Sequence, residues 1–373
     1  MPCFAKLFSP LLLCLVMTGC REHAPPEEPA TVIDAPANGI EGGALSSGPV
    51  PPASPRVVTL EGSDWPAAEL VSGKVLVDCE SDPIRPHDPS GSVLLPGGEP
   101  QESTRGRPLG DLSYGSVESA VLPCRGTGVV RLHYSGKIAA DFTDLVQRVA
   151  NMAQRHRIDE RILQLDSAGG HVEDAMKAGD AIGASRWIIR VDEDASCHSA
   201  CVLILAAGDY REISGPVGVH RMLRVGSTAT TREELTHELR EVHSHMKDYL
   251  ERNGAAVIVA DLMMTVPNRK LRLLNQTELL EYGLQGTNAV EDDLVRIQLS
   301  RKCGEDFVRR RDDYDRAFSR QCADSGNDLE ARDACGLELR KGFGFPDDKC
   351  PVESPLSRHD RDSLPTMDQI GFK

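Results

Sequence analysis

The sequence predicts an α/β fold with a mainly parallel central sheet. Between residues 126 and 290, short aliphatic and β-branched runs alternate with stretches in which apolar residues recur every three or four positions. The first pattern is typical of buried strands and the second of amphipathic helices. Because strands that alternate with helices form βαβ units, we expect these strands to run parallel in one sheet.

The elements of this region follow one another through short turns. A strand at 128–134 precedes a helix at 142–156, whose apolar residues Phe142, Leu145, Val149 and Met152 share one face. The elements that follow are a strand at 161–166, the turn SAGG at 167–170, a helix at 171–185, a strand at 187–192, a buried helix at 199–208 and a strand at 215–221.

A long amphipathic helix is expected over residues 230–254. Thr231 and Glu234 stand three residues apart, as in a capping box, and Asn253 with Gly254 forms a typical helix end. Such a helix packs its apolar face against the core. That face carries Leu235, Leu239, Val242, Met246 and Tyr249.

The segments on either side of this region differ in composition. Residues 1–19 have a basic start, an apolar run and a small-residue end, as in a signal peptide. Residues 20–55 are rich in Pro, Ala, Gly and Ser, which predicts a flexible tether. Residues 56–125 are expected to form a small irregular region with strands at 56–60 and 74–78. Residues 291–373 predict a helical tail that contains four cysteines.

The end of the signal, MTGC at 17–20, resembles a bacterial lipobox, although the family prefers leucine where Met17 stands. The resemblance implies cleavage before Cys20 and acylation of Cys20. An ordinary secretion signal with an unmodified Cys20 is the alternative. In both cases we expect export from the cytoplasm. The lipid would hold the protein at the bacterial cell envelope, facing the periplasm or the exterior.

The net charge of −15 limits the classes of partner. An acidic chain without a basic stripe and interleaved aromatic residues is not expected to bind nucleic acid. The same charge disfavours electrostatic docking on an anionic membrane. Membrane attachment would therefore depend on the lipid anchor alone.

Cysteine usage agrees with export. Of the eleven cysteines, Cys3 and Cys14 lie in the signal and Cys20 at the anchor, so eight remain. An even number in an oxidising compartment predicts disulfides, while the pairing stays open. One candidate pair would staple the region 56–125, and two pairs would hold the helical tail. The eight are Cys79, Cys124, Cys197, Cys201, Cys303, Cys322, Cys335 and Cys350.

Three polar features stand at strand ends, where α/β folds commonly place their ligands. In the SAGG turn, Gly170 can present its backbone N–H group to an anion. Ser199 stands between a strand and a hydrophobic helix, where the N–H group of Ala200 favours negative charge. His220 ends a later strand and is a natural general base. A nucleophile, a base and oxyanion donors are the parts that acyl transfer needs.

The order of these motifs resembles the proteolytic subunit of the Clp protease, within the Clp–crotonase superfamily. SAGG (167–170) stands where that family has SPGG, and SAC (199–201), LAAG (205–208), GVH (218–220) and EYGL (281–284) follow in the family's order. Twenty-nine positions separate Gly170 from Ser199, as in the family. The cysteine two positions before Ser199 and the AC after it also resemble exported Clp-like proteins. The resemblance covers about residues 126–290 and implies a ββα spiral core.

The resemblance also implies roles for residues. Ser199 would be the nucleophile, His220 the general base, and the N–H groups of Gly170 and Ala200 the oxyanion donors. Clp-like cores commonly assemble into rings or trimers, so a homo-oligomer is implied as well.

Departures from the family pattern affect the third member of the triad. Counting back from EYGL places Leu271 at the family's aspartate. Asn268 is the nearest polar residue and the candidate third member, and Asp261 is more remote. Cys201 stands where the protease commonly has glycine. A Ser-His dyad or an incomplete triad is therefore expected.

Other interpretations of these residues remain open. Cys197, His198 and Cys201 could ligate a metal, but a structural zinc site needs four ligands and no second pair stands nearby, so no metal is predicted. A disulfide between Cys197 and Cys201 would brace Ser199. Signal peptide peptidases of the same superfamily use a serine–lysine dyad, for which Lys247 is the candidate.

The sequence thus predicts an extracytoplasmic, membrane-anchored serine hydrolase, with a peptide or protein as substrate and no cofactor. A catalytically degenerate relative that binds a peptide or an envelope partner is the alternative. The missing aspartate favours the alternative, and the retained serine, histidine and glycine pair favour the enzyme.

Overall fold

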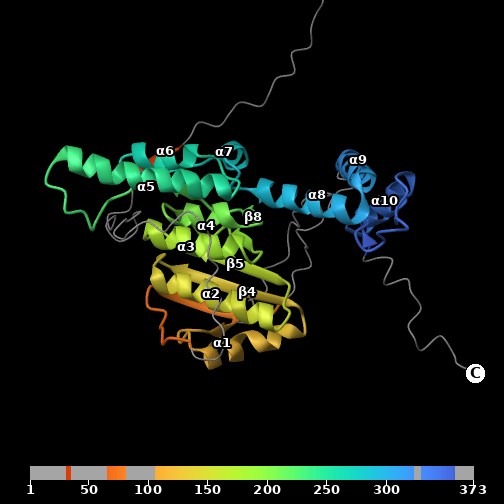
Figure 1. Cartoon of the computed structure of the whole chain (residues 1–373), viewed down its shortest axis with the longest axis horizontal. Helices are drawn as coiled ribbons and strands as arrows, with labels where there is room; N and C mark the ends of the chain where they lie inside the picture. Colours follow the sequence, from red (N-terminus) through yellow and green to blue (C-terminus); the bar gives the residue numbers. More distant parts are fainter. Residues whose placement is uncertain (1–30, 35–64, 81–105, 323–328, 358–373) are drawn as a thin grey trace, which may run out of the picture.

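Two β-sheets form the centre of the computed structural model, which describes residues 31–34, 65–80, 106–322 and 329–357 (Figure 1). The larger sheet has the strand order β11-β8-β6-β5-β4-β2-β3 and the smaller one β1-β10-β9-β7. The strands are β1 (Val32–Asp34), β2 (Gly73–Asp78), β3 (Arg107–Pro108), β4 (Val129–Gly136), β5 (Glu160–Asp166), β6 (Ile188–Val191), β7 (Cys197–His198), β8 (Tyr210–Ile213), β9 (Val217–Val219), β10 (Lys270–Leu273) and β11 (Gly286–Thr287).

Helices connect most of these strands. Within the described part of the chain they are α1 (Tyr114–Val121), α2 (Ala140–Arg155), α3 (Val172–Gly183), α4 (Cys201–Ala207), α5 (Arg232–Arg252), α6 (Ile258–Thr265), α7 (Gln276–Glu281), α8 (Ala289–Cys303), α9 (Glu305–Gln321) and α10 (Leu329–Gly342), with a short 3₁₀ helix at Leu122–Arg125.

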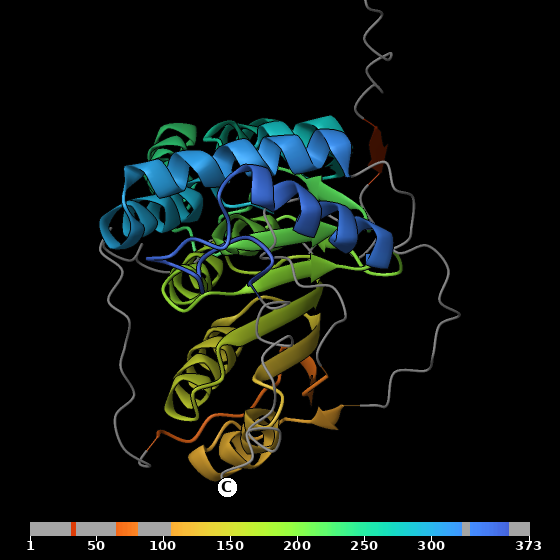
Figure 2. The same ribbon diagram turned by 90° about the vertical axis from the view of Figure 1, so that its right-hand side faces the viewer.

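The middle of the larger sheet is parallel. Strands β4, β5, β6 and β8 pair in that orientation, with α2 between β4 and β5 and α3 between β5 and β6. Figure 2 shows these strands edge to edge, with helices stacked along one side. The predicted α/β class and the alternation of strands and helices are confirmed. The spiral form of the core stays a prediction.

The apolar faces predicted for two helices can be compared with the burial of their side chains. In α2, the predicted face formed by Phe142, Leu145, Val149 and Met152 is completely buried. In α5, Thr231 and Glu234 form the predicted capping box. The apolar face of α5 is also buried, except that Leu235 in its first turn is 38% exposed. This turn extends past the sheets, so the core does not reach Leu235 (Figure 1).

The larger sheet also includes strands from before residue 126. Strand β2 pairs along its whole length with β4, in antiparallel orientation. Val75 and Val77 of β2 belong to the main apolar core, and a disulfide joins Cys79 to Cys124. The sheet thus runs across the boundary that composition suggests at 125/126. The strand predicted at 74–78 is present, and the one predicted at 56–60 lies outside the described residues.

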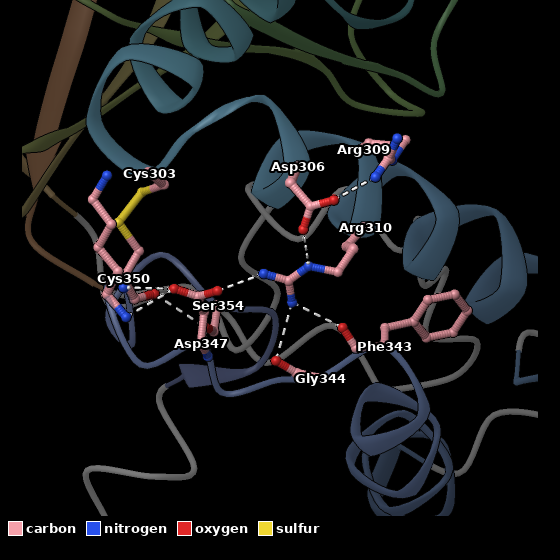
Figure 3. A network of polar contacts seen from close by, with 10 residues as sticks. Cys303, Asp306, Arg309, Arg310, Phe343, Gly344, Asp347, Cys350 and Ser354 are labelled. Atoms are coloured by element: carbon pink, nitrogen blue, oxygen red, sulfur yellow. Dashed lines mark hydrogen bonds and ion pairs between the residues drawn. A yellow bond between two sulfur atoms is a disulfide. The ribbon is translucent and has the colours of Figure 1, made fainter.

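The C-terminal helices form a second, smaller core. Helix α8 leaves the sheets and carries α9 and α10 at its far end (Figure 1). Disulfides Cys303–Cys350 and Cys322–Cys335 hold this extension together. Arg310 adds polar contacts, since its guanidinium binds Asp306 and Asp347 and donates to the carbonyls of Phe343 and Gly344 at 2.9 and 3.1 Å (Figure 3). The predicted disulfide-stapled helical tail is therefore present.

The smaller sheet brings β7 and β9 side by side, and Ser199 and His220 directly follow these two strands. Strand β7 pairs in parallel with β9, and β10 pairs with β9 in antiparallel orientation. Strand β1, from the segment predicted to be a tether, pairs with the other side of β10.

Across the described ranges, no helix has the length and apolarity needed to cross a membrane.

Candidate active site

Ser199 and His220 lie at the ends of two neighbouring parallel strands. The pairing of β7 with β9 aligns Cys197 with Val217 and His198 with Gly218, and the N–H group of Ser199 donates to the carbonyl of Gly218 at 2.8 Å. Each residue directly follows its strand. Because parallel strands end at the same edge of a sheet, the predicted nucleophile and base leave the sheet side by side.

Ser199 has an unusual backbone conformation. Its φ of 61° lies in the left-handed region, which few residues other than glycine adopt. The residue forms the sharp turn between β7 and α4. Its side chain is completely buried, and its Oγ atom makes no hydrogen bond to any described residue. A strained backbone and an unpaired buried hydroxyl are features that cluster at functional sites.

The turn that contains Gly170 lies next to β7. Ile138 donates to the carbonyl of Gly169 at 2.9 Å and accepts from the N–H group of His171 at 2.8 Å. In such a parallel bridge, the N–H group of the intervening residue points away from the partner. The N–H group of Gly170 is therefore directed away from Ile138. On the other side of the turn, Ser167 forms a bridge with Cys197 of β7.

A side chain at position 170 would disturb this arrangement. A β-carbon on Gly170 would come within 2.0 Å of the carbonyl oxygen of Ile138, so the close approach requires glycine. The second predicted donor, the N–H group of Ala200, belongs to the residue that caps the N-terminus of α4. The first N–H groups of a helix have no partner within it. The two predicted donors are thus backbone groups, one in the SAGG turn beside β7 and one in the residue that directly follows Ser199.

His220 is held by backbone on one side of its ring. Its Nδ1 atom lies 3.1 Å from the carbonyl oxygen of Arg221. The N–H group of Arg221 in turn donates to the carbonyl of Val266 at 2.6 Å. His220 is only 6% exposed. A hydrogen bond at Nδ1 leaves Nε2 as the ring atom suited to accept a proton.

Leu271 stands where a third member of a triad would be expected. Arg272 pairs with Val219, so the same antiparallel register, continued by one residue, places Leu271 opposite His220. The leucine is 2% exposed and packs over Gly218. Asn268, the candidate third member, is exposed in the turn before β10. That Leu271 occupies the position of the family's aspartate stays a prediction.

Lys247 and Asp261, the two other polar residues considered for the site, form an ion pair with each other. Lys247 Nζ and His243 Nε2 each lie 2.8 Å from Asp261 Oδ1. The hydrogen bond from Lys247 holds the pKa of Asp261 below its ordinary value. The ammonium group of Lys247 is thus paired with a carboxylate, and Ser199 Oγ makes no hydrogen bond to Lys247, to His220 or to any other described residue. This arrangement does not support the serine–lysine dyad.

His198 is a neighbour of the site that the sequence suggested only as a metal ligand. Burial lowers its pKa, the nearby charge of His220 lowers it further, and Asp166 raises it. His198 is therefore expected to be neutral at neutral pH. A neutral His198 does not oppose a positive charge that forms on His220. The sequence shows that His198 directly precedes Ser199. It does not show that His198 lies near His220, because that depends on how the two strands pair.

A disulfide joins Cys197 to Cys201 on either side of Ser199. Both cysteines are completely buried. Disulfide sulfurs are not thiolates, so these residues are not available as metal ligands. The chain between them contains the turn at Ser199, and the disulfide therefore limits the conformations that this turn can adopt.

Replacing both Cys197 and Cys201 by alanine is expected to lower the free energy of unfolding by about 2 kcal/mol, through the lost constraint on a short loop. The rate at which an active-site probe labels Ser199 should also fall, by about tenfold, because the turn loses its brace. Urea denaturation and probe labelling measure the two effects.

The matched control replaces Cys303 and Cys350, whose disulfide lies in the C-terminal extension. That variant should lose stability and keep its labelling rate. An equal loss of labelling in both variants would show that the disulfide at Ser199 has no special effect on the site.

Comparisons with known proteins give structural neighbours only. No protein-family model matches the chain, and no curated protein matches it. The membrane-bound stomatin-specific protease 1510-N is similar in two variant structures, one of them bound to a substrate peptide. The identities are 21% and 20%, both TM-scores are 0.34, and the matches cover 42% and 46% of this chain and 72% and 82% of the neighbours. A peptidase from Plasmodium falciparum has 12% identity and a TM-score of 0.33, over 45% of this chain and 96% of its own. At these scores the likeness carries no inference about what this chain does.

Proposed function

We propose that the protein is a serine hydrolase that cleaves peptide bonds through an acyl-enzyme. The observation that carries this proposal is the left-handed backbone of Ser199, at a strand-to-helix turn beside His220. A nucleophile on such a turn projects next to the first N–H groups of the following helix. The peptide as substrate class follows from the resemblance to Clp-type proteases.

The proposed chemistry assigns one role to each of these groups. His220 Nε2 takes the proton of Ser199 Oγ as the oxygen attacks the substrate carbonyl carbon. The N–H groups of Gly170 and Ala200 donate to the oxyanion of the tetrahedral intermediate. His220 then gives the proton to the leaving amine, and the C–N bond breaks. Water, activated by His220, hydrolyses the acyl-enzyme and regenerates Ser199.

The buried state of Ser199 adds one requirement. Because its side chain is completely buried, the groups that cover Oγ must move before a substrate can reach it. Such opening steps are common in hydrolases and limit many turnover rates. We therefore expect labelling by a reactive probe to be slow.

A fluorophosphonate probe tests the proposal. The wild type should be labelled covalently, whereas Ser199→Ala should not be labelled, and His220→Ala should react about 10²–10⁴-fold more slowly because it lacks the general base. Circular dichroism of all three proteins verifies folding. If the wild type is labelled no better than folded Ser199→Ala, the hydrolase proposal fails. Fluorogenic peptides then distinguish a peptidase from an esterase.

A second candidate is a catalytically degenerate protein that binds a peptide or an envelope partner in the same place. What favours it is Leu271, an apolar residue at the position that the resemblance assigns to the aspartate of the triad, one residue from the paired Val219 and Arg272. This candidate predicts peptide binding, measured by fluorescence polarisation, that is equal in the wild type and in Ser199→Ala, with no labelling of either.

We also propose that a lipid on Cys20 anchors the protein at the cell envelope, facing the periplasm or the exterior. The support is the signal-like segment 1–19 and the MTGC motif that ends at Cys20. Both lie outside the described residues. Metabolic labelling with a fatty acid should mark the wild type and not Cys20→Ala.

A further inference from the structure

Residues 221–230 connect the predicted base, His220, to α5. Within this segment only Met222 is buried, and its N–H group donates to the carbonyl of Met263 in α6 at 2.9 Å. The other residues of the segment are exposed or half-buried. The segment is therefore fixed where it leaves His220 and lies at the surface after Met222. We call residues 221–230 the strap.

Arg224 holds the middle of the strap between two helices. Its Nη1 atom donates to Oε1 of Glu173 in α3 at 3.0 Å, and its Nε atom donates to Oε2 of Glu238 in α5 at 3.3 Å. The side chain of Glu173 is 5% exposed and that of Arg224 is 17% exposed. Salt screens ion pairs of this kind weakly, and removal of one partner leaves an uncompensated buried charge. The two contacts therefore fasten the strap to the body of the protein.

The strap crosses the end of β7, where Ser199 stands. On one side of β7, Ser167 of the SAGG turn forms a bridge with Cys197. On the other side, β7 pairs with β9, which His220 follows. Glu173 belongs to the first turn of α3, which begins directly after the SAGG turn and His171. A segment that runs from His220 to Glu173 thus passes from one neighbour of β7 to the other, across the turn at Ser199.

We propose that the strap is a lid over the candidate active site, and that the ion pairs of Arg224 hold it closed. The inference rests on the proposed function, because it identifies the part of the molecule that must move before a substrate reaches the buried Ser199. It assigns the regulation of access to residues that take no part in the chemistry. Lids of this kind exclude water and limit turnover in many enzymes.

The strap has few apolar contacts that would oppose its opening. Leu223 and Val225, on either side of Arg224, are 42% and 57% exposed. Side chains this exposed contribute little burial to the closed form. The ion pairs of Arg224 are therefore expected to dominate the closing of this part of the strap.

A second ion pair between the same two helices provides a matched control. Arg252, at the other end of α5, donates to both carboxylate oxygens of Asp180 in α3, at 2.9 and 3.0 Å. Neither residue belongs to the strap. Arg252→Gln therefore removes a guanidinium–carboxylate contact between α3 and α5 and leaves the strap in place, whereas Arg224→Gln removes the contacts that close it.

Hydrogen exchange, read by mass spectrometry on the full-length chain, tests the lid without requiring catalysis. In Arg224→Gln, amides of residues 223–229 and of the turn 196–201 should exchange about tenfold faster than in the wild type. Peptides from α2 should keep their wild-type rates, which excludes global unfolding. Arg252→Gln should leave both segments near the wild-type rate. Glu238→Gln keeps the contact with Glu173, so it should produce a smaller increase and serves if Arg224→Gln does not fold.

Fluorophosphonate labelling of the same proteins separates the lid from the proposed function. Labelling of Ser199 should be about tenfold faster in Arg224→Gln and within about twofold of the wild type in Arg252→Gln. Unchanged exchange in the strap, or faster exchange in the strap without any change at 196–201, would overturn the lid. Faster exchange in both segments with no labelling of any variant would support the lid and reject Ser199 as a nucleophile.

Discussion

Replacing Leu271 by aspartate is expected to raise the rate at which a fluorophosphonate labels Ser199 by about 100-fold. Val219 and Arg272 are the last paired residues of β9 and β10, and His220 and Leu271 are the next residues along the two strands. A carboxylate there would accept a hydrogen bond from the imidazole and stabilise the imidazolium that forms when Ser199 loses its proton. Loss of such a carboxylate costs other serine hydrolases about 10⁴-fold.

The expected gain is smaller than that loss for two reasons. Leu271 is 2% exposed, so an aspartate must give up its hydration there. The new carboxylate must also replace the carbonyl of Arg221, which now lies 3.1 Å from His220 Nδ1.

Leu271→Ala is the matched control for Leu271→Asp, because it removes the same packing without adding an acceptor. Leu271→Asn separates hydrogen bonding from charge, and it should gain less than the aspartate. Labelling rates are compared at pH 8, after thermal unfolding has shown that each variant is folded. If aspartate and alanine behave alike, residue 271 does not act on His220, and the register does not bring the two side chains together.

The local elements of the fold could be predicted because their signals are local. The apolar spacing of Phe142, Leu145 and Val149 describes one face of one helix, and this face is buried as expected. The capping box of Thr231 and Glu234 involves residues three positions apart. Such patterns depend on helix geometry alone, so a single sequence contains them in full.

Other features depend on contacts between distant segments. The pairing of β2 with β4 joins residues on both sides of a loop-rich stretch, so composition suggested a boundary where the sheet in fact continues. Disulfide pairing also depends on tertiary distance. From the sequence, several cysteines could pair with Cys197. In the structure it forms a disulfide with Cys201. Strand pairing and cysteine pairing are therefore outcomes of packing that local patterns do not contain.

Part of the candidate site could be predicted, because its residues stand next to local signals in the sequence. Ser199, His220 and Gly170 follow strands directly, and strand ends can be recognised from sequence. The effect of His220 on the pKa of His198 could not be recognised, because it arises from the pairing of β7 with β9.

Replacing Gly170 by alanine is expected to slow labelling of Ser199 by about 10²–10³-fold, the loss seen when one oxyanion donor is removed from other hydrolases. The added methyl group would lie 2.0 Å from the carbonyl oxygen of Ile138, which is closer than two such atoms can approach. The bridge between Ile138 and Gly170 must then shift, and the N–H group of residue 170 moves with it.

A control with a similar steric conflict separates this local effect from general instability. A β-carbon on Gly336 would come within 2.5 Å of Phe318 in the C-terminal extension, which has its own apolar core. Gly336→Ala should therefore lower the unfolding midpoint and leave the labelling rate within about twofold of the wild type, since distant sites act independently. If Gly170→Ala keeps the wild-type rate while its stability falls, the turn has a structural role only, and the oxyanion must find its second donor elsewhere.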